Sequence, residues 1–154
     1  MNIAIGSDHA GYPLKKIAIE TIQNLGHKVI DMGTNSEKTV DYPDFASKVG
    51  SAIQNKEAER GILFCGSGIG ACIAANKMKG IYAGTCHDTY SAHQGVEHDD
   101  MNVLCLGARI IGVELMREII QAFLEARFQG CDKGQERHAR RVAKLKKIES
   151  ENMA

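Results

Sequence analysis

Residues 61–70 read GILFCGSGIG, an apolar run that ends at Cys65 and passes directly into a loop rich in glycine. This order predicts a buried strand over residues 61–65 and a helix over residues 69–78. Strand, loop and helix in succession form the repeating unit of an α/β protein with a parallel sheet. The same succession recurs on both sides of this stretch.

The other apolar runs and helical spacings complete the pattern. Short apolar runs predict further strands over residues 2–6, 29–30, 80–86 and 103–106. Apolar residues at helical spacing predict helices over residues 12–25, 42–53, 89–97, 113–128 and 135–150. Strands and helices in this alternation predict a doubly wound, five-stranded parallel sheet flanked by helices, and we expect residues 1–154 to form one such domain.

Composition and charge narrow the function classes. With 154 residues, 44% of them hydrophobic, the chain can bury the core of about one domain. The 19 basic and 19 acidic residues cancel, which argues against wholesale binding to nucleic acid or to an anionic membrane. Neither an apolar run of about 18 residues nor the residue order of a signal peptide occurs. We therefore expect a soluble cytoplasmic protein whose partner is a small molecule or another protein.

The five cysteines lack the CxxC spacing of a zinc or redox site. We expect most of them to be reduced, buried and small apolar side chains. No metal site is predicted.

Reactive side chains follow four of the predicted strands. They are Ser7, Asp8 and His9 after the first strand, Cys65 and the loop 66–70 after the third, His87 and Asp88 after the fourth, and Arg109 after the fifth. Ligands of an open parallel sheet bind beyond the carboxyl ends of its strands, so we expect these residues to meet at one edge. Glycine-loop amides at the start of a helix favour an anionic atom, either a phosphate oxygen or a transient oxyanion.

The glycine loop permits a second interpretation. Gly66, Gly68 and Ala71 fit a relaxed dinucleotide-binding fingerprint, and Asp88 follows at a distance suited to a ribose hydroxyl. Two features weigh against it: the fingerprint follows the third strand rather than the first, and the chain is too short to add a substrate domain. A small dinucleotide-sensing domain stays open as an alternative, and it predicts tight binding of NAD or a related cofactor.

A basic helix is predicted near the end of the chain. Arg137 and Arg141 lie four residues apart, so they share one helical face. Two guanidinium groups on one face suit a phosphate clamp, to which Arg109 can contribute. A solvated basic face is the alternative interpretation.

Six ordered motifs are together more specific than any one of them. They are Gly6-Ser7-Asp8-His9-Ala10-Gly11, Asp41-Tyr42-Pro43, Cys65-Gly66-Ser67-Gly68-Ile69-Gly70, His98-Asp99-Asp100-Met101-Asn102, Gly107-Ala108-Arg109 and Arg137-His138-x-x-Arg141. In this order, and over nearly the whole chain, they resemble the type B ribose-5-phosphate isomerases. These belong to a sugar-phosphate isomerase family that also contains the galactose-6-phosphate isomerase subunits.

The resemblance implies a fold and an activity. The implied fold is a Rossmann-like five-stranded sheet. The implied assembly is a homodimer whose active sites lie at the subunit interface, and such dimers often pair into tetramers. The implied reaction is the interconversion of ribose 5-phosphate and ribulose 5-phosphate through an enediolate, with no metal and no cofactor, in the pentose phosphate pathway of carbohydrate metabolism. An isomerase of a six-carbon sugar 6-phosphate, of the allose or galactose type, is the alternative within the family.

The resemblance also implies roles for individual residues. Cys65 is similar to the cysteine that moves the proton between C1 and C2, and His98 resembles the histidine that helps to open the furanose ring. Ser67 and the loop amides resemble the cradle of the enediolate oxygen. The implied loop residues are Gly66, Gly68 and Gly70, the implied sugar contacts are Asp8, Tyr42 and Asn102, and the implied phosphate contacts are His9, Arg109, Arg137 and Arg141. The last two are implied to reach the site of the partner subunit.

The chemistry of these residue types agrees with the implied roles. Abstracting a proton beside a carbonyl builds charge on oxygen, which preorganised N–H donors stabilise. A glycine loop at a helix start favours a thiolate, which makes Cys65 a better base than Cys72, Cys86 or Cys105. Where some family members carry a glutamate base, this chain has Ala71.

Three departures from the family pattern concern the site. Asp99 adds a negative charge beside His98, which is expected to favour the protonated ring or to repel phosphate. Ser67 stands in place of a frequent threonine and keeps the hydroxyl. Residues 130–136 are longer than the usual turn, which bears on how Arg137 and Arg141 approach the site.

Overall fold

The sheet of the computed structural model, which describes residues 1–153, confirms the predicted fold class. Its strand order is β2-β1-β3-β5-β4, and every neighbouring pair is parallel. The strands are β1 (Asn2–Ser7), β2 (Lys28–Asp31), β3 (Arg60–Cys65), β4 (Ala83–Thr85) and β5 (Val103–Gly107). The three interior strands, β1, β3 and β5, are therefore each paired with a strand on both sides.

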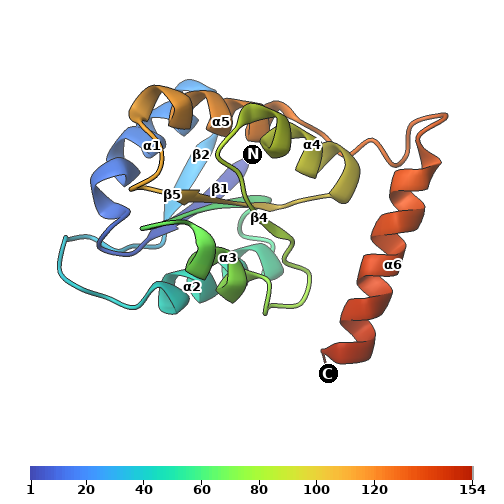
Figure 1. Cartoon of the computed structure of the whole chain (residues 1–154), viewed down its shortest axis with the longest axis horizontal. Helices are drawn as coiled ribbons and strands as arrows, with labels where there is room; N and C mark the ends of the chain where they lie inside the picture. Colours follow the sequence, from blue (N-terminus) through green and yellow to red (C-terminus); the bar gives the residue numbers. More distant parts are fainter. Residues whose placement is uncertain (154) are drawn as a thin grey trace.

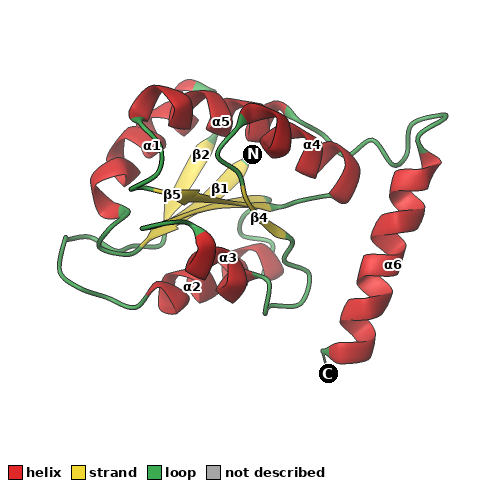
Figure 2. Ribbon diagram, in the orientation of Figure 1, coloured by secondary structure: helices red, strands yellow, loops and turns green. Residues whose placement is uncertain are grey.

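Helices lie on both faces of this sheet (Figures 1 and 2). One face carries α1 (Tyr12–Asn24), α4 (Thr89–Asp99) and α5 (Val113–Glu125), and the other carries α2 (Tyr42–Gln54) and α3 (Ile69–Ala75). Parallel neighbours require crossover connections, and the helices supply them.

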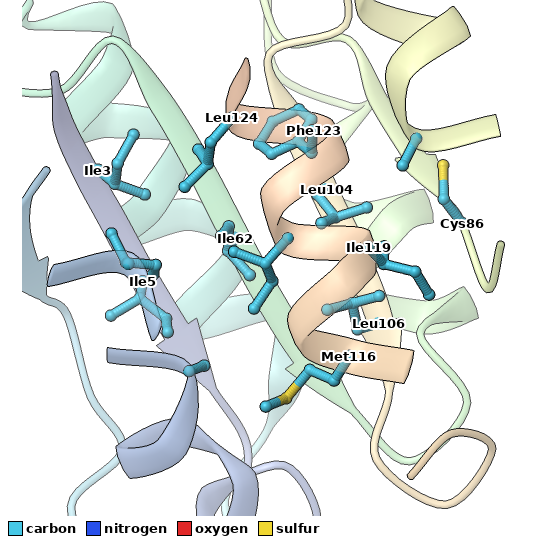
Figure 3. Close-up of a cluster of buried hydrophobic side chains, with 14 of the residues drawn as sticks. Ile3, Ile5, Ile62, Cys86, Leu104, Leu106, Met116, Ile119, Phe123 and Leu124 are labelled. Carbon is cyan, nitrogen blue, oxygen red and sulfur yellow. The ribbon is translucent and has the colours of Figure 1, made fainter. Parts of the chain in front are cut away.

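Alternation along the strands divides the core into two layers. On β3, Ile62 faces the α5 side and Leu63 faces the α2 side. Figure 3 shows the first layer, whose labelled members include Ile5, Ile62, Leu104, Leu106, Met116, Ile119 and Phe123. Burial of each such side chain stabilises the fold by roughly 1.5–3 kcal/mol. The second layer is built largely from alanine and valine, so α2 and α3 pack close to the sheet.

The connections after β1 and β3 leave in opposite directions. α1 follows β1 onto one face, whereas α3 follows β3 onto the other. Adjacent strands whose helices diverge in this way open a crevice at their carboxyl ends, which is where open α/β sheets bind ligands. Asp8, in the loop after β1, and Cys65, the last residue of β3, lie at this crevice.

The last helix, α6 (Glu136–Asn152), lies apart from the sheet and the helices that flank it (Figure 1). It buries only His138 and Val142 and leaves Leu145 and Ile148 exposed. Near its end, the Glu149 carboxylate accepts hydrogen bonds from the Gly80 N–H at 2.7 Å and from the Tyr82 hydroxyl at 3.4 Å. α6 thus touches the rest of the chain at both ends while most of its surface is free of contact within one copy.

Three elements are shorter than the sequence predicts. α5 ends at Glu125 rather than at residue 128, and side-chain bonds explain the other two. α3 ends at Ala75 rather than at residue 78, because the Asn76 side chain bonds both the N–H and the carbonyl of Ala83 at 2.9 Å. β4 begins at Ala83 rather than at residue 80, because the Tyr82 N–H donates to the side chain of Asn102. Over residues 1–153, no helix combines the length and the apolar character that crossing a membrane requires.

Candidate active site

The glycine loop after β3 forms the floor of the candidate site. Gly68 adopts a left-handed conformation (φ +80°), which turns its N–H toward the Cys65 sulfur at 3.2 Å. The Ser67 hydroxyl accepts a hydrogen bond from the Ile69 N–H at 3.3 Å. The thiol and the hydroxyl therefore lie at the start of α3 with backbone N–H donors around them.

Asp8 reaches the same place from β1. Its own N–H donates to the Phe64 carbonyl at 3.1 Å, which ties the β1 loop to the end of β3. Its carboxylate accepts from the N–H groups of Ala10 and Gly11 at 2.9 and 3.0 Å, and the side chain is almost fully buried. Two backbone donors fix the carboxylate in one orientation beside Cys65.

The β5 loop and α2 close over two of the glycines. The N–H groups of Ala108 and Arg109 donate to the carbonyls of Cys65 and Gly66 at 2.9 and 3.0 Å. A Cβ atom at Gly66 would lie 3.2 Å from the Arg109 guanidinium. A Cβ atom at Gly70 would lie 2.6 to 3.0 Å from three ring atoms of Tyr42. Gly70 therefore leaves room for the Tyr42 ring on the loop, whereas a side chain at Gly66 would require only a small shift of the flexible Arg109.

These residues surround one cavity of about 400 Å³. It is lined by Asp8, Tyr42, Cys65, Gly66, Ser67, Gly70, Arg109 and Ile110. An adjoining hollow shares Asp8 and Tyr42 and adds His9. The Nδ1 atom of His9 accepts the Val40 N–H at 3.2 Å, so in the neutral ring the proton belongs on Nε2, where it is a donor suited to an anion.

Three other predicted site residues form a second group, away from this cavity. His98, in the last turn of α4, stacks on His138 of α6 with ring centroids 3.9 Å apart and planes inclined by 12°. Gln94 bonds the Nδ1 atom of His98 at 2.9 Å. Arg137 and Arg141 lie on either side of His138 in the first turns of α6, and both are exposed. Burial, the His98 ring and these two arginines lower the pKa of His138.

The two groups lie toward opposite ends of the molecule. The cavity is at the carboxyl ends of the strands, beside the starts of α1 and α2, whereas α6 and the end of α4 are at the other end in Figure 1. Within one copy, His98, Arg137 and Arg141 do not line the cavity that contains Cys65. His138 was not among the predicted site residues, although its place between the two arginines was a usable signal.

Within one copy, Asn102 also lies away from the cavity, so its predicted sugar contact stays a prediction. Asn102 precedes β5, so it lies at the amino edge of the sheet rather than at the carboxyl edge. Its side chain accepts the Tyr82 N–H at 2.8 Å and donates to the Gly80 carbonyl at 2.9 Å. It fastens the segment before β4 and is not part of either group.

Asp88 has a local role that removes it from the dinucleotide interpretation. Its carboxylate accepts from the N–H and the hydroxyl of Ser91 at 2.6 and 2.8 Å, which caps the start of α4. Both carboxylate oxygens thereby serve the helix cap, which weighs against the dinucleotide interpretation. Across residues 1–153, no group of three or more His, Cys, Asp or Glu side chains could hold a metal ion.

The candidate site combines a thiol, a hydroxyl and oriented backbone amides at the topological switch point of a parallel sheet. This combination defines a class of protein, the α/β enzymes that act on small anionic substrates. The match to a known family is more specific. The chain belongs to the ribose/galactose isomerase family, whose model matches residues 3–145.

Three relatives indicate the range of this family. The chain is 43% identical to ribose-5-phosphate isomerase B of Escherichia coli, covering 96% of this chain and 95% of that protein. It is 46% identical to D-erythrulose-4-phosphate isomerase of Pectobacterium atrosepticum, covering 84% and 86%. It resembles the structure of ribose-5-phosphate isomerase B of Mycoplasma genitalium with bound ribulose 5-phosphate, with a TM-score of 0.89, 40% identity and coverage of 98% and 97%.

Proposed function

We propose that the protein interconverts ribose 5-phosphate and ribulose 5-phosphate. The observation that carries this proposal is the Cys65 thiol, held by the Gly68 N–H in a cavity that Asp8, Ser67 and Arg109 also line. Family membership and the names of the relatives support the same reaction. The cavity, about 400 Å³, is of the size that small-molecule sites have.

In the proposed mechanism, Cys65 is the base. Its thiolate removes the proton from C2 of the open-chain aldose, and the electron pair of that C–H bond moves through C1 to the carbonyl oxygen. The resulting enediolate is stabilised by the N–H donors of the loop and by Ser67. A proton passes from the C2 oxygen to the C1 oxygen, and the Cys65 thiol then protonates C1, which leaves the carbonyl at C2. The base is regenerated.

We further propose that two copies complete each site. His98, Arg137 and Arg141 cannot serve their own cavity from the far end of the molecule, but an antiparallel second copy can present them to it. Exposed apolar side chains support such an interface: Ile69 and Ile110 beside the cavity and Ile148 on α6 are each more than half exposed. His98 would assist ring opening, and the two arginines would hold the phosphate with His9 and Arg109. Pairing of dimers into tetramers stays a prediction, as does a cytoplasmic location.

The substrate is tested by comparing sugar phosphates of different length. Purified protein is expected to isomerise ribose 5-phosphate with a higher kcat/KM than allose 6-phosphate, galactose 6-phosphate or erythrulose 4-phosphate. A higher value for a six-carbon substrate would favour the alternative within the family. Tight binding of NAD, with no turnover of any sugar phosphate, would instead support a dinucleotide-sensing domain.

A further inference from the structure

His87 is one of the reactive side chains that follow the predicted strands, and the proposed mechanism leaves it unused. It is half-buried, follows the end of β4, and does not line the cavity that contains Cys65. Its Nε2 atom accepts a hydrogen bond from the Gly107 N–H at 2.9 Å. A backbone N–H can only donate, so Nε2 carries no proton, and the proton of the neutral ring is on Nδ1.

This hydrogen bond replaces one that the sheet does not make. The ladder between β4 and β5 ends where the Cys86 N–H donates to the Cys105 carbonyl at 3.3 Å. Backbone groups two residues apart on a strand point to the same side, so the Gly107 N–H points toward β4 at a level where β4 has already ended. Gly107 is buried, and a buried N–H requires an acceptor, which the His87 ring supplies.

Gly107 is in turn packed against the glycine loop of the site. A Cβ atom at Gly107 would lie 2.7 Å from both the carbonyl carbon and the carbonyl oxygen of Ser67, so no side chain fits between them. The two residues that follow Gly107 donate their N–H groups to the carbonyls of Cys65 and Gly66. The position of Gly107 therefore helps to fix the backbone that carries Cys65 and Ser67.

The segment that carries His87 is itself held in place. Before the ring, the Cys86 N–H bonds to β5, and after it, Asp88 caps the start of α4. The Thr85 hydroxyl, from the same segment, donates to the Gly68 carbonyl at 3.1 Å. Residues 85–88 thus brace the glycine loop from the β4 side at two points, one directly and one through the end of β5.

We infer that His87 is a positioning residue for the isomerase site. Its unprotonated Nε2 atom holds the end of β5, and the end of β5 holds the glycine loop in the geometry that stabilises the enediolate. The inference rests on the proposed isomerase function, because that reaction is what gives the loop amides their task. Preorganised donors act on charge that develops in the transition state, so a displaced loop lowers kcat more than it weakens phosphate binding.

Two substitutions separate positioning from packing. His87→Gln places an amide oxygen the same number of bonds from the main chain as Nε2, whereas His87→Leu removes the acceptor. In His87→Leu we expect kcat for ribose 5-phosphate to fall roughly ten- to a hundredfold, while the Tm stays within a few degrees of wild type. The inhibition constant of inorganic phosphate should change by less than about twofold. His87→Gln should recover most of the lost kcat. His27→Leu, just before β2 at the amino edge of the sheet, is the matched control and should keep the wild-type kcat.

NMR tests the hydrogen bond itself. In isotopically labelled wild-type enzyme, we expect a scalar coupling across the hydrogen bond between the amide nitrogen of Gly107 and Nε2 of His87. A proton on Nε2 would overturn the inference. So would a kcat for His87→Leu within about twofold of wild type, or a loss of kcat that His87→Gln does not recover. The coupling requires no turnover, whereas a wild-type enzyme without turnover would contradict the proposed function, so the two failures are distinguishable.

Discussion

Mixing two inactive variants tests whether each site draws residues from two copies. One subunit carries Cys65→Ala, which removes the proposed base, and the other carries Arg137→Ala with Arg141→Ala, which removes the proposed clamp. Both arginines are exposed, and among residues 1–153 neither forms an ion pair, so the fold should tolerate their loss. Two charge-assisted bonds at roughly 1.5–3 kcal/mol each correspond to a loss of about 10² to 10⁴ in kcat/KM.

The expected recovery follows from the two-fold symmetry. In a mixed dimer, one site receives both lesions and the other receives neither. Random exchange of equal amounts makes about half of the dimers mixed, so the mixture should regain about a quarter of wild-type activity. The assay is ribose 5-phosphate turnover after co-refolding, with each variant refolded alone as the control. A mixture no more active than its parents would refute a clamp that crosses the interface, while leaving the isomerase assignment intact.

Three further results are expected. His98→Asn should reduce turnover of the furanose substrate more than turnover of the open-chain ketose, since only the former must open its ring; equal losses in the two directions would reassign His98 to phosphate binding. Gly70→Ala should displace the Tyr42 ring and raise KM severalfold, and it should add nothing in a Tyr42→Ala background; additive effects would show that Gly70 acts independently of the ring. His138 has a lowered pKa in the folded state, so the unfolded chain takes up the proton first as pH falls below about 6.5; the Tm should therefore decrease from pH 7.5 to pH 5.5, and His138→Gln should flatten that dependence if the histidine is its source.

The fold followed from local patterns, because strand and helix periodicities in this chain agree with its tertiary structure. The run 61–65 and its glycine loop predicted β3 and the start of α3. The ends of α3 and β4 were missed, because long-range side-chain bonds from Asn76 and Asn102 set them. The pattern of neighbouring residues along the sequence does not predict such bonds.

The sequence predicted the part of the candidate site that lies at the carboxyl ends of the strands. Asp8, Cys65 and Arg109 follow three strands whose carboxyl ends meet, and they are close together in the structure. Asn102 precedes the predicted strand over residues 103–106, so its place at the amino edge of the sheet, away from the cavity of its own copy, could also be predicted.

The most direct test of the account is the kcat of Cys65→Ala beside that of Cys72→Ala. A general base contributes about 10² to 10⁴ in rate, so Cys65→Ala should lose at least two orders of magnitude in turnover of ribose 5-phosphate. It should still bind inorganic phosphate and keep the wild-type Tm within a few degrees. Cys72→Ala should retain nearly full turnover, because Cys72 lies outside the cavity. Turnover by Cys65→Ala within about tenfold of wild type would contradict the assignment of Cys65 as the base.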